Sequence, residues 1–186
     1  MLIKEQQIEL RNNKTITLRS ATKKDAKAQC NHWIQTAKES PFLARYPEEC
    51  VFNITEIENE LQAIENSPIS FMINAFDDHQ MVANARIVAI KELQKFRHRG
   101  YFIISIIDEY CNSGLGGIIL KEAKKQAIEN GFTQIELGLF EDNQRAKHVY
   151  EKNGFVEIGR QPRAFKQKDG SYKDEILMVC FLDKEN

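Results

Sequence analysis

The chain has little of what marks membrane, nucleic-acid-binding or metal-binding proteins. No apolar run approaches the roughly 20 residues that a helix needs to cross a bilayer, so we expect no membrane association. The net charge is −1, which gives no case for nonspecific nucleic-acid binding. The four cysteines lie far apart without C-x-x-C spacing, and this argues against a metal site.

The size and composition fit one compact domain. The 186 residues are 42% hydrophobic and 28% charged, with no linker, repeat or low-complexity segment, so we expect a single domain over residues 1–186 with its core at about 16–182. Residues 1–7 lack the apolar core of a signal peptide. We therefore expect a cytoplasmic protein, in which the cysteines stay reduced.

Strand and helix patterns alternate along the chain. Thr22-x-x-Asp25 is a capping box that predicts the start of the first helix, and Pro41 and Pro68 predict the ends of the first two helices. The pattern predicts an α/β (α+β) fold, with a mixed, mostly antiparallel sheet of about seven strands and about four helices. The expected strands are 15–19, 69–76, 81–91, 100–107, 135–139, 156–161 and 174–182, and the expected helices begin near residues 22, 54, 115 and 143.

A glycine-rich turn follows the most apolar of these strands. Residues 101–107 read Tyr-Phe-Ile-Ile-Ser-Ile-Ile, and Ser113-Gly114-Leu115-Gly116-Gly117 then opens a helix. Unpaired N–H groups and the helix dipole make such a helix start suitable for a diphosphate. Taken alone, the turn could equally be a tight connection. It matches neither the dinucleotide fingerprint of the Rossmann fold nor a phosphate-binding P-loop.

A second segment, about thirty residues later, carries two polar side chains on one helix face. Asn143 and Tyr150 are seven residues apart, which is two helical turns. By itself Asn143 could be a plain helix cap and Tyr150 a half-buried tyrosine. Together with the glycine turn, however, they suggest a nucleotide-carrying acyl donor that meets a proton donor.

Both segments resemble motifs of the GNAT N-acetyltransferase superfamily. Residues 106–116, Ile-x-Asp-Glu-Tyr-Cys-Asn-Ser-Gly-Leu-Gly, look like its acetyl-CoA motif, in which an Arg or Gln precedes x-x-Gly-x-Gly/Ala. Asn143-x-x-Ala146-x-x-x-Tyr150-x-x-x-Gly154-Phe155 is similar to the next motif, and residues 168–178 look like the last hairpin. The resemblance covers about 16–182, with one departure: Cys111 stands where the motif has Arg or Gln.

The resemblance implies an acetyl-CoA-dependent N-acetyltransferase without a metal, which moves an acetyl group directly to a primary amine. Backbone groups near Ile106 and Ile107 would hold the thioester, Asn143 would bond the pantetheine amide, and Arg145 or Lys147 would meet the 3′-phosphate. Tyr150, with a reference pKa of about 10, would protonate the leaving thiolate. The implied donor-binding residues are Ile106, Ile107, Asp108, Cys111, Asn112, Ser113, Gly114, Leu115, Gly116, Gly117, Asn143, Arg145, Ala146 and Tyr150.

The general base and the acceptor stay open at this point. His98 is the candidate base, because its reference pKa of about 6.5 suits the task; Asp108, Glu109 and a water relayed from Ser105 are alternatives. The loops at 41–51 and 163–171 would select the acceptor, which we expect to be a small-molecule amine. The alternatives are a protein N-terminus or, without catalysis, an acyl-CoA-binding module. A homodimer is a further open option.

Overall fold

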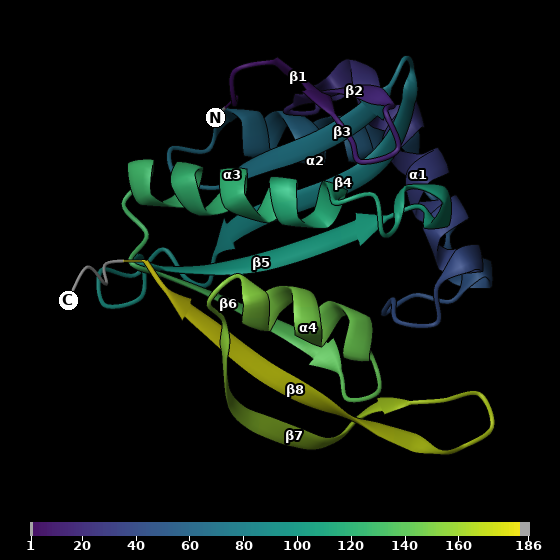
Figure 1. Cartoon of the computed structure of the whole chain (residues 1–186), viewed down its shortest axis with the longest axis vertical. Helices are drawn as coiled ribbons and strands as arrows, with labels where there is room; N and C mark the ends of the chain where they lie inside the picture. Colours follow the sequence, from purple (N-terminus) through teal and green to yellow (C-terminus); the bar gives the residue numbers. More distant parts are fainter. Residues whose placement is uncertain (1, 183–186) are drawn as a thin grey trace.

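One twisted sheet with helices on both faces forms the protein (Figure 1). The computed structural model describes residues 2–182. Its strands are β1 (Gln6–Glu9), β2 (Thr15–Arg19), β3 (Phe71–Asp77), β4 (Gln80–Ala89), β5 (Arg99–Ile106), β6 (Gln134–Phe140), β7 (Val156–Lys166) and β8 (Tyr172–Phe181). Its α-helices are α1 (Ala26–Glu39), α2 (Ile54–Asn66), α3 (Leu115–Glu129) and α4 (Gln144–Lys152), and its short 3₁₀ helices are η1 (Lys23–Asp25), η2 (Pro47–Glu49) and η3 (Asp108–Tyr110).

The mixed α/β class and the mostly antiparallel sheet are confirmed, with one strand more than expected. The strand order is β1-β2-β3-β4-β5-β6-β8-β7, which makes eight strands among the described residues. The additional strand is β1, which pairs antiparallel with β2 at the edge of the sheet. Its four residues alternate between half-buried and exposed positions, and they are too few to give a recognisable periodic pattern.

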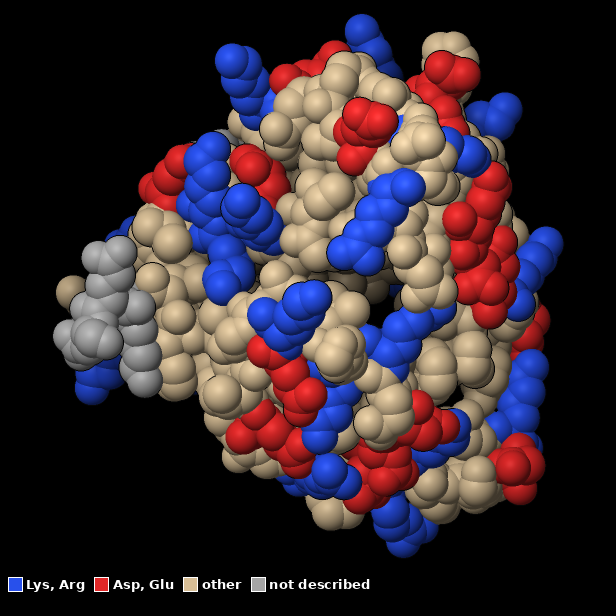
Figure 2. Space-filling view, viewed as in Figure 1, with Lys and Arg blue, Asp and Glu red and all other residues tan. Residues whose placement is uncertain are grey.

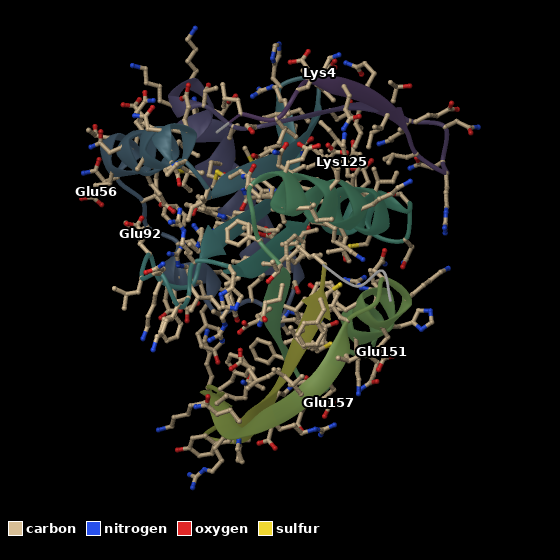
Figure 3. All side chains as sticks on the ribbon, turned by 90° about the vertical axis from the view of Figure 1, so that its left-hand side faces the viewer. Lys4, Glu56, Glu92, Lys125, Glu151 and Glu157 are labelled. Atoms are coloured by element: carbon tan, nitrogen blue, oxygen red, sulfur yellow. The ribbon has the colours of Figure 1, made fainter. Side chains whose placement is uncertain are left out.

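The two faces of the sheet carry different helices. Helices α3 and α4 cover one face, and α1 and α2 cover the other (Figure 1). In the side view of Figure 3, Glu56 of α2 and Glu151 of α4 accordingly lie on opposite sides of the molecule. Strand β3 shows the alternation that this layering requires: Phe71 and Ile73 belong to the larger buried cluster, whereas Met72 and Phe76 belong to the smaller one.

The helix ends that the sequence predicts carry the positive φ angles or the capping contacts that such ends require. Gly131 after α3 and Gly154 after α4 have φ values of 84° and 87°, which favour glycine. The side chain of Asp25 accepts the N–H of Thr22 at 2.8 Å, so the capping box forms. It caps the N-terminus of η1, the short 3₁₀ helix that leads directly into α1. These ends fix the loops that precede and follow the candidate site.

Strands β5 and β6 separate partway along their length. They form the one parallel pair within residues 2–182, and their pairing is confined to Arg99 with Gln134, Gly100 with Ile135 and Tyr101 with Glu136. Beyond Tyr101 and Glu136 both strands continue, to Ile106 and Phe140, without pairing to each other. Figure 1 shows the two ribbons diverging toward the start of α3. The sheet therefore has a wedge-shaped opening, which we call the splay.

Candidate active site

The turn between η3 and α3 has the geometry of an anion-binding site. Asn112 and Gly114 have φ values of 61° and 90°, and the Ser113 hydroxyl donates to the carbonyl of Tyr110 at 2.7 Å. Gly116 and Gly117 lie in the first turn of α3, where N–H groups have no partner inside the helix. A side chain at residue 117 would meet no atom within 4 Å, so the surroundings are open. A phosphate can approach these N–H groups closely.

Cys111 supplies no positive charge to this turn, whereas the Arg of the family motif would. Its sulfur lies 4.0 Å from the carbonyl oxygen of Ile106, and burial raises the pKa of the thiol. A guanidinium nevertheless lies nearby, because Arg11 in the turn between β1 and β2 donates its backbone N–H to Ser113. Its Nε would be 3.2 Å from a Cβ placed on Gly114. Arg11 is about a hundred residues before the motif, and no sequence signal connects the two.

Helix α4 begins beside the open end of the splay. The Asn143 side chain accepts the N–H of Ala146 at 3.2 Å, so its oxygen caps the helix and its amide N–H groups remain for other partners. Arg145 lies 3.9 Å from Asp108 of η3 and spans the mouth of the splay. Lys147, in contrast, is paired with Glu157 at 2.9 Å. Of the two cations expected near the donor, Arg145 is the one at the opening.

Tyr150 reaches into the closed end of the splay. Its ring packs edge-on against Phe102 at 6.4 Å and tilted against Phe155 at 5.6 Å. Phe102 is the first residue of β5 after pairing with β6 stops. Burial, together with the nearby Tyr101, raises the pKa of the Tyr150 phenol above its usual value. The phenol is therefore protonated at neutral pH and available as a donor.

The charge around the opening suits a ligand with phosphate groups. Figure 2 shows a hollow between the upper part of the molecule, where α3 lies in the same view, and the lower part, where α4 lies. Lys and Arg side chains border this hollow. No three His, Cys, Asp or Glu side chains in the described part of the chain come together to hold a metal ion. Nor does any helix there have the length and apolar content to span a bilayer.

The base candidates from the sequence lie at different places. His98 immediately precedes β5, beyond the paired end of the splay, and its carbonyl accepts the N–H of Thr133. Asp108 is beside Arg145 at the open end, and Glu109 is paired with Lys14 at 2.6 Å. Among residues 2–182, no hydrogen bond, ion pair or ring contact joins any of these three side chains to Tyr150.

Ser105, the remaining candidate, is held by a buried histidine. Its hydroxyl lies 2.7 Å from Nε2 of His32 on α1, and Nδ1 of His32 faces the carbonyl of Met81 at 3.1 Å. Burial lowers the pKa of His32 to about 4, so the ring is neutral at physiological pH. The pair connects α1 to the C-terminal end of β5, and no pattern in the sequence indicates it.

The two loops expected to select the acceptor come together. Lys168 pairs with Glu48 at 2.5 Å and lies over the ring of Tyr46 at 4.5 Å. The ring of Phe140, at the end of β6, stacks on that of Phe165 of β7 with centroids 3.8 Å apart. The ring of Phe42 packs tilted against that of Phe140, with centroids 6.0 Å apart. An aromatic group, Phe42, Phe140 and Phe165, therefore lies at the end of β6, next to the splay.

Comparison with known proteins gives consistent results. The acetyltransferase (GNAT) family matches residues 28–155. A structure of a GNAT-family acetyltransferase from Streptococcus pneumoniae is similar with a TM-score of 0.85 and 28% identity, over 89% of this chain and 99% of that one. A structure from Salmonella typhimurium, described as an acetyltransferase with its cofactor acetyl-CoA, shares the fold with a TM-score of 0.79 and 16% identity, over 92% and 96% of the two chains.

A curated relative adds a more distant match. The [ribosomal protein bS18]-alanine N-acetyltransferase of Haemophilus influenzae is 30% identical over 81 residues, which are 44% of this chain and 55% of that protein. The match thus spans little more than half of the relative's length. The family match, in contrast, covers more than half of this chain, including the glycine turn, the splay and α4. The chain therefore belongs to the GNAT family of acetyltransferases.

Proposed function

We propose that this protein transfers the acetyl group of acetyl-CoA directly to a primary amine, within a complex that holds both substrates. The observation that carries the proposal is the splay between β5 and β6, which has an anion-binding turn at its open end and a protonated phenol at its closed end. An extended pantetheine chain would run between these two features. The GNAT family uses acetyl-CoA, and this fits the hollow with its basic border.

The residues around the splay divide the work of binding the donor. The N–H groups of Ser113 to Gly117 would take the diphosphate, and Arg11 and Arg145 would add positive charge at the two sides of the turn. Backbone groups of β5 beyond its pairing with β6, up to Ile106, would bond the pantetheine and the thioester oxygen. The Asn143 amide would donate to a pantetheine carbonyl, because only its oxygen is used in the helix cap.

Tyr150 would act as the general acid. Acetyl-CoA supplies an activated thioester whose leaving group is a thiolate. The phenol points into the closed end of the splay from α4, and it has no hydrogen bond to another described residue that would compete for its proton. Proton donation by a positioned side chain typically contributes about 10²–10⁴-fold to a rate. His98 would need to move toward the splay to serve as the base.

A small-molecule amine is the acceptor that the surroundings favour. The aromatic group Phe42, Phe140 and Phe165 lies at the end of β6, and aromatic faces attract cationic amines. A protein N-terminus is the second candidate, because the Haemophilus influenzae relative acts on a ribosomal protein. Either reaction would draw on acetyl-CoA in the cytoplasm, the compartment expected from the sequence.

An assay of thiol release from acetyl-CoA tests the proposal. The panel should contain simple primary amines, polyamines, amino acids and peptides with N-terminal alanine. Turnover with small amines but not with peptides would support the first candidate, and the opposite preference would support the second. If the protein binds acetyl-CoA but releases no thiol with any acceptor beyond the rate of hydrolysis, the proposed reaction is wrong and the chain acts as a binding module.

A further inference from the structure

A carboxylate outside the two donor motifs lies over Gly138, two residues beyond the last residue of β6 that pairs with β5. Glu175 of β8 is opposite Phe140 of β6, on the face of the sheet that carries α1 and α2. Gly138 of β6 leaves the room for it: a Cβ there would collide with the Glu175 carboxylate, at 2.6 Å from its carbon, and would be 3.0 Å from the Tyr101 hydroxyl. Glu175 and Tyr101 therefore meet over Gly138.

Glu175 differs from the carboxylates around it because no cation neutralises it. Within residues 2–182 its side chain makes no hydrogen bond or ion pair, and burial raises its pKa above the ordinary value. The nearby Glu136 is bound through both oxygens to Arg99, at 2.5 and 2.7 Å. The other acidic side chains near this end of β6 and β8 also have partners: Glu141 with the N–H of Asp174, Asp142 with Lys173, and Asp174 with the N–H of Arg163.

Tyr101 connects this carboxylate to the proposed acid. The pKa of Tyr101 is raised by burial and by the charge of Glu175, and Tyr101 in turn raises the pKa of Tyr150. Tyr150 enters the splay from the face of α4, whereas Tyr101 and Glu175 lie on the face of α1 and α2. Tyr101 is the last residue of β5 that pairs with β6, and it interacts electrostatically with both Glu175 and Tyr150.

We propose that Glu175 is the general base of the reaction, the carboxylate that takes a proton from the acceptor ammonium, with Tyr101 positioning it beside the splay. This inference rests on the proposed function. A cationic amine reaching the thioester from the face of α1 and α2 would pass the aromatic group Phe42, Phe140 and Phe165 and meet the one uncompensated negative charge there.

The protons and electrons balance as follows. Glu175 takes one proton from the ammonium, and the freed lone pair forms the C–N bond at the thioester carbon. As the C–S bond breaks, its electron pair leaves on sulfur, which takes the proton of Tyr150. The second proton lost by nitrogen restores the Tyr150 phenol. Glu175 releases its proton to water, so each acetylated ammonium yields the amide, free CoA thiol and one proton.

The test compares Glu175→Gln with wild type, using the best small amine from the panel between pH 6 and the pKa of that amine. We expect kcat of Glu175→Gln to be about 10²–10⁴-fold lower near neutral pH, with CoA affinity by calorimetry unchanged. The deficit should shrink as pH rises, because the free amine no longer needs a base. The titratable group that faces Glu175 is Tyr101. Beyond Tyr101 lie the Glu136–Arg99 ion pair and Tyr150. From β7 the facing residue is Gln161, which does not titrate.

Two glycine variants give an independent test. Gly138→Ala should displace the flexible end of Glu175 and lower kcat in the same way, whereas Gly159→Ala in β7, where an added Cβ meets nothing within 4 Å, is the matched control. A carboxyl NMR titration of the CoA-free protein should find the pKa of Glu175 above its ordinary value. In Gly138→Ala this pKa should move back toward the ordinary value.

Three results would overturn the inference. The first is an unchanged kcat in Glu175→Gln, and the second is a deficit of the same size at every pH, which would indicate a structural role. The third is a higher KM with unchanged kcat, which would make Glu175 an anchor for the ammonium group and not its base. Absence of wild-type turnover with every acceptor would instead refute the proposed function, and this inference with it.

Discussion

Replacing Tyr150 by Phe removes one oxygen and leaves the packing of α4 in place. The ring contacts with Phe102 and Phe155 involve only the aromatic body, and the phenol makes no hydrogen bond to another described residue. We therefore expect the free energy of unfolding to change by less than about 1 kcal/mol. The rate should fall by about 10²–10⁴-fold, equivalent to about 3–5 kcal/mol of transition-state stabilisation.

The assay is steady-state thiol release, with urea unfolding and CoA calorimetry as controls for folding and donor binding. The loss should appear in kcat, because the proton is needed only when the thiolate departs. Because burial raises the pKa of Tyr150 above its usual value of about 10, wild-type kcat should not decline through ionisation of this group below about pH 10. A Tyr150→Phe variant that turns over like wild type would refute the role of the phenol as acid.

Three further variants test other parts of the structure. Gly116→Val should weaken CoA binding, since a Cβ there already lies 3.4 Å from Ile106 and the larger side chain would obstruct the phosphates; unchanged affinity in the folded variant would argue against the cradle. Cys111→Arg should tighten CoA binding, with a gain that shrinks at high salt; equal gain at all salt concentrations would mean that the position does not face phosphate. Burial disfavours the Asp25 carboxylate, but its bonds to Arg19 outweigh this and hold its pKa below the ordinary value, so the pair contributes its full stability above about pH 4 and loses it as pH falls through the folded pKa. Asp25→Asn should be less stable than wild type at pH 7 in urea and show a smaller difference at acidic pH; a constant difference would mean that the ion pair does not contribute.

Local patterns allowed most of the fold to be predicted from the sequence. The capping box at Thr22, the glycines at 131 and 154 and the alternation in β6 each depend on residues a few positions apart, and all three are present in the structure. Strand β1 was missed because its stability comes from pairing with β2, which no pattern within Gln6–Glu9 records.

The donor side of the site could be read from the sequence more fully than the acceptor side. The turn at 113–117 and the positions of Asn143 and Tyr150 are contiguous motifs. Arg11 and His32 reach Ser113 and Ser105 across more than 70 residues, and sheet pairing brings Glu175 opposite Phe140 across 35. Glu175 in particular depends on the absence of a side chain at Gly138, a condition that is meaningful only once β6 and β8 are neighbours.

The separation of β5 and β6 also affects how firmly the protein holds together. Within residues 2–182, three residue pairs make up the strand pairing between β1 to β5 and the part of the sheet formed by β6, β8 and β7. A ligand bound in the splay lies between β5 and β6 in the place of a strand. When its free concentration is a hundred times its Kd, it adds about 2.7 kcal/mol to the free energy of unfolding. Resistance of the folded chain to proteases would then rise and fall with the supply of acetyl-CoA, so its lifetime in a starved cell would be shorter than in a well-fed one.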